Sequence, residues 1–325
     1  MDQNPVKNSS NYYSLNVNLS CHTFAIKQLL QQQLFRAINL SGISSQPTDL
    51  VSRTKFLPSN IPLHRLTDDA FLIYRSPVAL QQAARLQLKT IELANLLIES
   101  FQTIDQKNTT NKRLEFRVEV TPPGWINFCL SEQSLSIWLQ NATQASLPSE
   151  KNGINELYSL TALKDTLSPD QSLSLFKLKY FHARCCSLLR LAQRQVLIKL
   201  GQSQGNSSFL QIFEPNPIPW LINHQELEVN QAYLRLKHPA EMCLIFKIID
   251  VQDIVNYQNQ IGLLKLGTAL CTSFDSFYRS CRIWGEVKTN NPQLSQARLG
   301  LVNITQVLLC FILQERLGVS APMEL

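Results

Sequence analysis

Residues 177–200, KLKYFHARCCSLLRLAQRQVLIKL, decide how the second half of this chain folds. At 100° per residue, one stripe of a helix would gather small and apolar residues, namely Leu178, Cys185, Leu189, Ala192, Val196 and Leu200. Lys179, Arg190 and Arg194 fall on roughly the opposite face. No carboxylate occurs from Gln171 until Glu214. The stretch therefore predicts an amphipathic helix with a strongly basic outer face.

That basic face has two interpretations. Arg190 and Arg194 lie four residues apart, so their like charges repel across one turn by a few tenths of a kcal/mol. An anionic partner beside the face would turn this repulsion into attraction. A solvated face on a bundle helix explains the same pattern without a partner. Charge alone leaves both interpretations open.

The composition favours a helix-rich protein of two domains. The chain has 325 residues, an apolar fraction of 44% and only 10 glycines, which argues against a Gly-rich nucleotide-binding fold. The formal net charge is +6. Residues 1–170 carry 15 cations and 14 anions, whereas residues 171–325 carry 15 and 10. The basic excess thus lies in the second half, which indicates a polyanionic partner there.

The cysteines indicate no metal site and no disulfide framework. None of the eight forms a CxxC pair or clusters with histidine at metal-ligand spacing, and most lie within apolar runs as small core residues do. The N-terminus lacks an apolar signal region, and the longest apolar run, Val307–Leu313, is too short to cross a bilayer. We expect a cytoplasmic protein with no membrane contact, no metal and no cofactor.

The first half mixes helices and strands. A polar tail over residues 1–21 precedes an α+β domain over residues 22–140. The elements expected in that domain are a helix capped by Thr23 and running to Ile38, two short strands within 63–74, one helix from Ser76-Pro77 to Phe101, a hairpin within 116–130 around Thr121–Gly124, and a helix from Ser131 to Gln140.

The second half is predicted to be an all-α bundle over residues 171–325. A polar segment over 141–170, with Pro148 and Gly153, is expected to be a linker. Beyond the basic helix, we expect helices over 223–236, 239–249 and 251–283, and a last helix that Asn291-Pro292 begins and Gly318 ends.

Several motifs resemble arginyl-tRNA synthetases. The string YFHARCCSLLRLAQ resembles the helix that opens the DALR anticodon-binding domain of that family, which shares its positions Tyr180, His182, Ala183, Arg184, Ser187, Leu188, Leu189 and Arg190. Residues 266–285 and 296–325 resemble the rest of that domain. In the first half, VEVTPPGWINFCLS (118–131) and YRSPVALQQA (74–83) resemble the family's N-terminal additional domain.

The resemblance lacks the family's catalytic part. Only some 30 residues separate the two similar regions. One strand–helix–strand unit alone needs about that length, so a catalytic domain with a parallel sheet does not fit between them. Neither ATP-handling signature of the family, the HIGH-like or the KMSK-like motif, is present. The resemblance therefore implies a paralogue without the catalytic Rossmann domain, and not an enzyme.

The resemblance also implies candidate RNA contacts. Tyr278 takes the place of a family tyrosine that stacks near an anticodon base, and stacking suits unpaired loop bases. Arg279 and Arg282 beside it, with Lys179, Arg184, Arg190 and Arg194, are candidate phosphate ligands. Tyr278 as a core residue and Arg184 as a structural ion pair remain alternatives. Tyr74 is a candidate D-loop contact, although Leu72, Ile73 and Pro77 replace the family's residues around it, and packing at a strand end explains it equally.

Two functions remain as hypotheses. The first is a non-catalytic tRNA-binding protein that favours arginine tRNA and serves as chaperone, carrier or accessory subunit to a synthetase or tRNA-modifying enzyme. The second is a protein–protein interaction module that has lost its affinity for tRNA. The concentrated positive charge favours the first hypothesis. The altered C-terminus, Ser-Ala-Pro-Met-Glu-Leu instead of the family's Ser-Ala-Pro-Glu-Arg-Met, favours the second.

Overall fold

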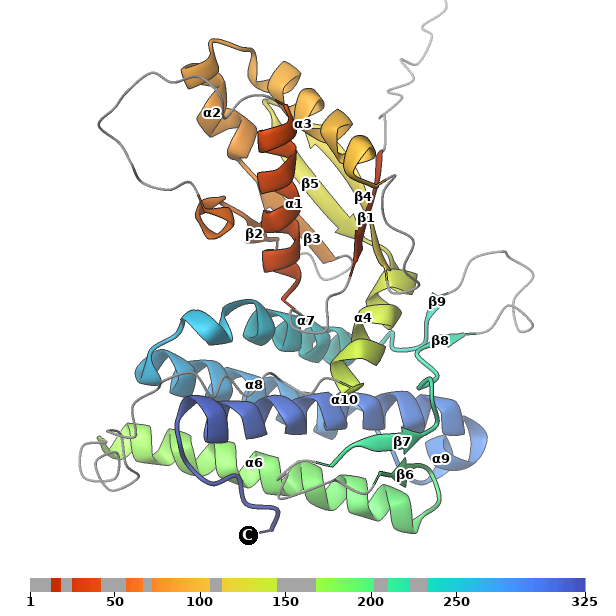
Figure 1. Ribbon diagram of the computed structural model, residues 1–325. Coiled ribbons are helices and arrows are strands. Elements are labelled where there is room, and N and C mark those ends of the chain that lie inside the picture. The colour runs from red at the N-terminus through yellow and green to blue at the C-terminus, as the bar shows by residue number, and fades with distance from the viewer. Residues whose placement is uncertain are drawn as a thin grey trace, which may run out of the picture. The chain divides into compact units, whose positions relative to one another are not determined.

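The computed structural model describes residues 13–18, 25–41, 57–66, 72–105, 113–144, 168–201, 210–222 and 233–324. The chain divides into two compact units, residues 1–135 and 136–325. The first is an α+β unit and the second is mainly helical, which confirms the expected fold class (Figure 1). The polar tail expected over residues 1–21 is wrong in part, because residues 13–18 form a strand that pairs within a sheet. The rest of that tail, the Thr23 cap and most of the expected linker lie outside the described residues.

The first unit is built on a five-stranded antiparallel sheet with strand order β1-β4-β5-β3-β2. Its strands are β1 (Tyr13–Asn18), β2 (His64–Arg65), β3 (Leu72–Ser76), β4 (Arg113–Thr121) and β5 (Trp125–Leu130). Along β4, Leu114, Phe116 and Val118 are buried while Glu115 and Arg117 are exposed. This alternation is typical of a sheet with one face in the core.

Three helices cover the buried face of this sheet, namely α1 (Ile26–Leu40), α2 (Val78–Leu86) and α3 (Thr90–Asp105) (Figure 1). The single helix expected from Ser76-Pro77 to Phe101 is wrong, because Gln87 adopts a left-handed conformation and separates α2 from α3. The Thr90 hydroxyl then donates a hydrogen bond to the Pro123 carbonyl in the β4–β5 turn. Contact with that hairpin, which is distant in sequence, fixes the start of α3.

Helix α4 (Glu132–Gln144) begins in the first unit and continues into the second. The Ser131 hydroxyl accepts a hydrogen bond from the Ser134 amide at 3.1 Å, which confirms the expected cap. Within the second unit, the Gln140 side chain accepts hydrogen bonds from the Ile218 amide at 2.9 Å and from the Trp220 indole at 3.0 Å. The C-terminal part of α4 therefore belongs to the helical unit.

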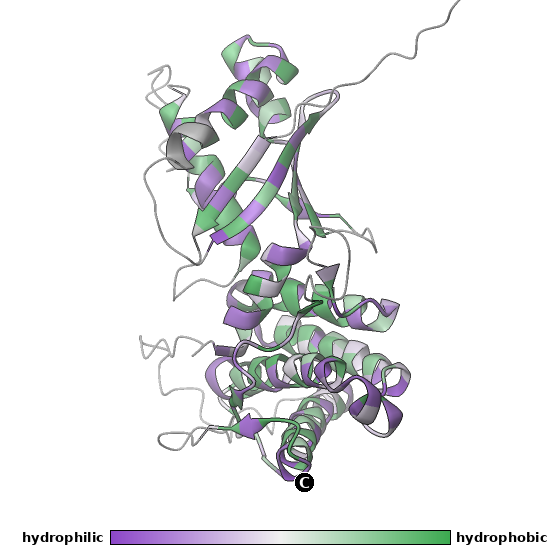
Figure 2. Ribbon diagram, turned by 90° about the vertical axis from the view of Figure 1, so that its right-hand side faces the viewer, coloured by the Kyte–Doolittle hydropathy of each residue, from purple (hydrophilic) through white to green (hydrophobic). Residues whose placement is uncertain are grey.

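The second unit is a helical bundle whose long helices are α6 (Pro169–Arg194), α7 (Pro239–Ile254), α8 (Gln260–Ser280) and α10 (Pro292–Phe311). A short helix, α9 (Glu286–Asn290), precedes α10, and a π-helical turn (Ile312–Arg316) follows it. Helix α10 packs against both α6 and α7, and α8 packs against α6 and α7. In both units, hydrophobic and hydrophilic residues alternate along the strands and around the helices (Figure 2).

Helix α10 forms the core of the bundle. The helix and the turn after it, Pro292–Arg316, are long and apolar enough to cross a membrane, but 94% of their most apolar window is buried inside the protein. The Asn291 side chain accepts a hydrogen bond from the Leu294 amide at 3.1 Å, which confirms the expected start of this helix. The burial of Pro292–Arg316 is typical of a helix in the core of a bundle.

Three sequence predictions for the second unit were wrong in detail. The basic helix ends at Arg194, because Val196 has a positive φ of 58° and the chain turns into β6 (Lys199–Leu200) and β7 (Ile212–Glu214). Val196 is consequently 86% exposed instead of buried. A helix was expected over 223–236, but Tyr233–Leu234 form strand β9, which pairs with β8 (Leu221–Ile222). Residues 223–232 lie outside the described part of the chain. Asn259 caps a new helix within 251–283.

Candidate nucleic-acid interface

Helix α6 supplies four of the predicted RNA contacts, and its beginning is well defined. Ser168 and Gln171 form a capping box, in which the Ser168 amide donates to the Gln171 side chain at 3.0 Å and the Gln171 amide to the Ser168 hydroxyl at 3.4 Å. The apolar stripe of α6 is buried as expected, with Leu178, Cys185 and Leu189 inaccessible to solvent. The opposite side of α6 therefore carries its cations outward.

Arg184 on α6 and Tyr278 on α8 meet on the surface of the bundle. The guanidinium carbon of Arg184 lies 5.3 Å from the centroid of the Tyr278 ring, a cation–π distance. Arg184 also donates a long hydrogen bond, 3.4 Å, to the Tyr278 hydroxyl. Arg184 is exposed and Tyr278 half-buried. Within the described residues Arg184 makes no ion pair, so its alternative role as a structural ion pair is not supported.

The side of the Tyr278 ring that faces the core is supported by Phe274. The two rings stack, with ring centroids 6.3 Å apart and planes inclined by only 9°. Phe274 is buried and in turn packs edge-on against Phe181 of α6. Tyr278 therefore combines a buried support with a partly exposed ring, on which an unpaired base could stack if the Arg184 guanidinium over the ring moves aside.

The cations around this pair differ in how far they are neutralised. Lys177 donates a hydrogen bond of 2.9 Å to the Thr272 hydroxyl of α8. Arg279 forms an ion pair with Asp275 one turn earlier on α8, at 2.9 Å. Arg282 is exposed just beyond the end of α8, and Lys179 is half-buried on α6. Arg184 and Arg282 thus offer more free positive charge than Arg279.

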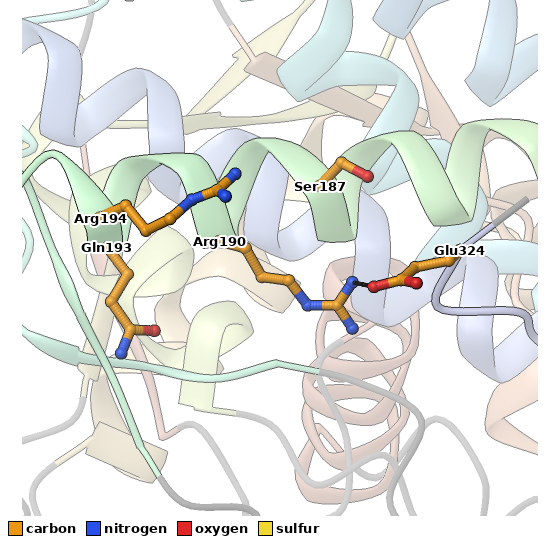
Figure 3. Close-up of a pocket in the computed structure, with 5 residues that line it drawn as sticks. All are labelled: Ser187, Arg190, Gln193, Arg194 and Glu324. Carbon is orange, nitrogen blue, oxygen red and sulfur yellow. Dashed lines mark hydrogen bonds and ion pairs between the residues drawn. The ribbon is translucent and has the colours of Figure 1, made fainter.

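A second basic region lies farther along α6. Ser187, Arg190, Gln193, Arg194 and Glu324 line a surface hollow of about 790 Å³ (Figure 3). Arg190 reaches toward Glu324, and its Nη1 atom lies 2.8 Å from the Glu324 carboxylate (Figure 3). Arg194 is exposed, and its side chain runs along the helix without a contact to that carboxylate (Figure 3). Arg190 has no carboxylate near it in the sequence, but in the folded structure the Glu324 carboxylate lies beside it.

Sequence reasoning missed Glu324 as a component of this site. The residue lies 134 positions from Arg190, so no local pattern connects the two side chains. The altered C-terminal sequence was the one signal that drew attention to this segment. The structure shows that the altered residues lie directly on the basic helix.

His182 has a structural role in placing that segment. It is fully buried, its Nδ1 atom lies 2.8 Å from the Pro322 carbonyl oxygen, and its Nε2 atom lies 2.9 Å from the Gln306 amide. These contacts give His182 a packing and orienting role. They tie α6 to the core helix α10 and to the C-terminal segment.

Tyr74 is not available as a D-loop contact in this structure. Its side chain is 1% exposed, in the middle of β3 and opposite Phe128 of β5. The alternating burial of β3 directs Leu72, Tyr74 and Ser76 into the core. The alternative interpretation, packing in the sheet, is the one that the structure supports, because a buried ring presents no surface to RNA.

The described residues contain no group of three or more histidine, cysteine or carboxylate side chains that could hold a metal. Burial raises the pKa of the Cys186 and Cys271 thiols to about 12, so neither is a thiolate at neutral pH. Cys243 is exposed, although it lies beside an apolar run as the buried cysteines do. The cysteines in the bundle core thus act as small apolar residues.

Comparison with known proteins agrees with this geometry. Residues 221–325 match the family model described as DALR anticodon binding domain. The chain is 32% identical over 144 residues to an arginine–tRNA ligase of Synechococcus sp., covering 44% of this chain and 21% of the relative. It is 31% identical over 152 residues to the corresponding ligase of Heliobacterium modesticaldum, covering 46% and 22%.

The matched part of this chain thus spans about a fifth of the length of these curated relatives. No solved structure matches significantly. The match to the family model includes Tyr278, Arg279, Arg282 and Glu324, and it ends with the chain. Residues 221–325 are therefore similar to the DALR anticodon binding domain, and 44% to 46% of the chain is similar to part of the arginine–tRNA ligases.

Proposed function

We propose that this chain binds tRNA without aminoacylating it, and that it receives the anticodon stem-loop on the surface formed by α6 and α8. The observation that carries the proposal is the Arg184–Tyr278 pair, a supported aromatic ring beneath a cation. Tyr278 lies within the region that matches an anticodon-binding domain, and Arg184 lies on α6, which precedes that region. Arg194 and Arg282 extend positive charge along this surface, where phosphates of a stem-loop would lie.

Arginine tRNA is the tRNA that we propose as the favoured ligand. The curated relatives bear the name arginine–tRNA ligase, and the similarity to them supports this choice. We propose that the anticodon loop supplies the base for Tyr278, because loop bases are unpaired and can be displaced onto an aromatic ring. Each stacked base contributes roughly 1–3 kcal/mol to binding.

The absence of catalysis is part of the proposal. Helix α4 ends at Gln144 and α6 begins at Pro169, so 24 residues separate them. That interval is shorter than one strand–helix–strand unit of about 30 residues, and a parallel nucleotide-binding sheet needs several such units. We propose that the chain acts in the cytoplasm as a chaperone, carrier or accessory subunit beside a synthetase or a tRNA-modifying enzyme.

A titration with tRNA tests this proposal. Purified protein is mixed with labelled arginine tRNA and with two unrelated tRNAs, at low salt and at near-physiological salt. Submicromolar binding that prefers arginine tRNA at the higher salt is the expected result. Weak binding to all three tRNAs that disappears with salt would reject the proposal, because counterion release alone produces that behaviour.

A protein–protein module is the second candidate, and one observation favours it. Near its start, α6 exposes Leu173 by 67%, Phe176 by 58% and Tyr180 by 45%. At 100° per residue these three side chains share one face of the helix. Replacing Phe176 by Ser should leave tRNA binding intact if this face serves a protein partner, whereas a parallel loss of tRNA affinity would assign the face to RNA.

A further inference from the structure

Residues 319–324, which we call the C-terminal segment, run along the basic helix α6. Three successive residues of the segment contact three successive turns of the helix. The Pro322 carbonyl lies 2.8 Å from His182, the Met323 sulfur lies 3.7 Å from the Cys186 sulfur, and the Glu324 carboxylate lies 2.8 Å from Arg190. The segment is therefore anchored through its backbone and Met323 at sites other than the carboxylate.

The last of these contacts differs from the other two. His182 and Cys186 are buried, whereas the Glu324 side chain is 79% exposed and that of Arg190 34%. Arg190 also donates to the Met323 carbonyl at 3.2 Å, so its guanidinium stays beside the segment even without the carboxylate. An ion pair as exposed as this one is weak and is exchanged readily for another anion.

A carboxylate and a phosphate are alternative ligands for the same guanidinium. Both present oxygen acceptors that match the planar donors of arginine, and a guanidinium discriminates little between them by shape. The hollow around the pair is open and is also lined by Ser187, Gln193 and Arg194, which could each donate to a phosphate. Among the described residues, Glu324 is the one carboxylate that lines it.

We propose that Glu324 is an intramolecular competitor of an RNA phosphate at Arg190. The inference rests on the proposed function, since it concerns how the same surface is regulated. RNA that binds α6 must displace the carboxylate from Arg190 or bind beside its negative charge. Glu324 therefore lowers the affinity for every RNA. It removes non-specific binding first, because RNAs that also place a base on Tyr278 keep a second source of binding energy.

The test compares E324Q with the wild-type protein in tRNA titrations at several salt concentrations. The amide of glutamine keeps the size of the side chain and removes its charge. We expect E324Q to bind arginine tRNA roughly two- to five-fold more tightly, the range that corresponds to an exposed ion pair. The plot of log K against log salt should become steeper by about one unit, because Arg190 then contributes as a free cation.

The matched control is E214Q. Glu214 pairs with Lys199 at 2.6 Å, also on the surface of this unit, so its substitution makes the same change in net charge. A smaller gain in E214Q than in E324Q separates competition at Arg190 from a general electrostatic effect. In an R190A background, E324Q should gain no more affinity than E214Q does, because the carboxylate has no guanidinium to release once Arg190 is absent and only the general charge effect remains.

The outcomes separate this inference from the proposed function. Equal affinities of the wild-type protein, E324Q and E214Q, in a protein that binds tRNA, overturn the competition and leave the proposed function intact. Weaker binding by E324Q also overturns it, since Glu324 would then be a ligand for RNA. No tRNA binding by any variant, with unchanged thermal unfolding midpoints, overturns both.

Discussion

Arg184 and Tyr278, 94 residues apart in sequence, form a cation–π pair of 5.3 Å that joins α6 to α8. The ring is supported by Phe274, so the pair is fixed in orientation while part of it stays accessible. An aromatic ring that is neither buried in the core nor free to rotate can receive a base with little loss of conformational entropy. This relationship leads to the first of four predictions.

Replacing Tyr278 by Ala should reduce selectivity between tRNAs. Losing one stacked base costs about 1–3 kcal/mol of binding, or roughly 5- to 150-fold in affinity for the preferred tRNA. Y278F keeps the ring and loses only the 3.4 Å hydrogen bond with Arg184, so it should behave nearly as the wild-type protein does. Competition titrations with cognate and unrelated tRNAs measure the effect. A large fall in the unfolding midpoint with unchanged selectivity would show that Tyr278 is a structural residue.

Arg194 should contribute more to the salt dependence of RNA binding than Arg190. Arg194 is exposed without an ion pair among the described residues, whereas Glu324 already neutralises Arg190. R194A should flatten the plot of log K against log salt by about one unit, and R190A by clearly less. K247A on α7 removes the same charge where Asp250 already pairs with it, and serves as the control. Unchanged slopes in both arginine variants would place RNA elsewhere.

The buried ion pair between Arg298 of α10 and Glu241 of α7 should be the most sensitive polar contact in the bundle. The two side chains are 10% and 1% exposed, their atoms lie 2.6 Å apart, and Arg298 also donates to the Arg282 carbonyl. R298A leaves the Glu241 carboxylate buried without its partner, which should cost about 3–5 kcal/mol of unfolding free energy. Denaturant titration measures this cost.

The exposed pair Lys199–Glu214 provides the comparison for that measurement. K199A should change the unfolding free energy by at most about 1 kcal/mol, because both groups remain hydrated when the pair is broken. If R298A and K199A were equally mild, Arg298 and Glu241 would not be a structural connection between α7 and α10.

Close packing of α6 on α8 depends on Gly267. A Cβ atom added there would come within 2.6 Å of the Leu178 side chain, which is inaccessible to solvent. We expect G267A to reduce the unfolding free energy by about 1–3 kcal/mol through overpacking. The double variant G267A/L178A should lose less than the sum of the two single losses, because the shorter side chain makes room for the new methyl group. Additive losses would show that the two residues do not interact.

The sequence by itself determined most of the fold. Periodic apolar residues predicted α6, and capping residues placed the starts of α4 and α10, because helix burial and capping depend on residues only three or four positions apart. The β4–β5 hairpin followed in the same way from alternating strands around Thr121–Gly124. Local motifs likewise identified the surface of α6 and α8 on which the candidate site lies.

Only the tertiary structure decided which of the candidate residues are accessible and which are already paired. Tyr74 proved buried because β3 directs alternate side chains into the core, and α2 was separated from α3 where a hairpin distant in sequence contacts Thr90. Arg190 proved neutralised because the chain returns to α6 after 134 residues and places Glu324 beside it. Such contacts depend on how the whole bundle packs, and no short-range pattern in the sequence encodes them.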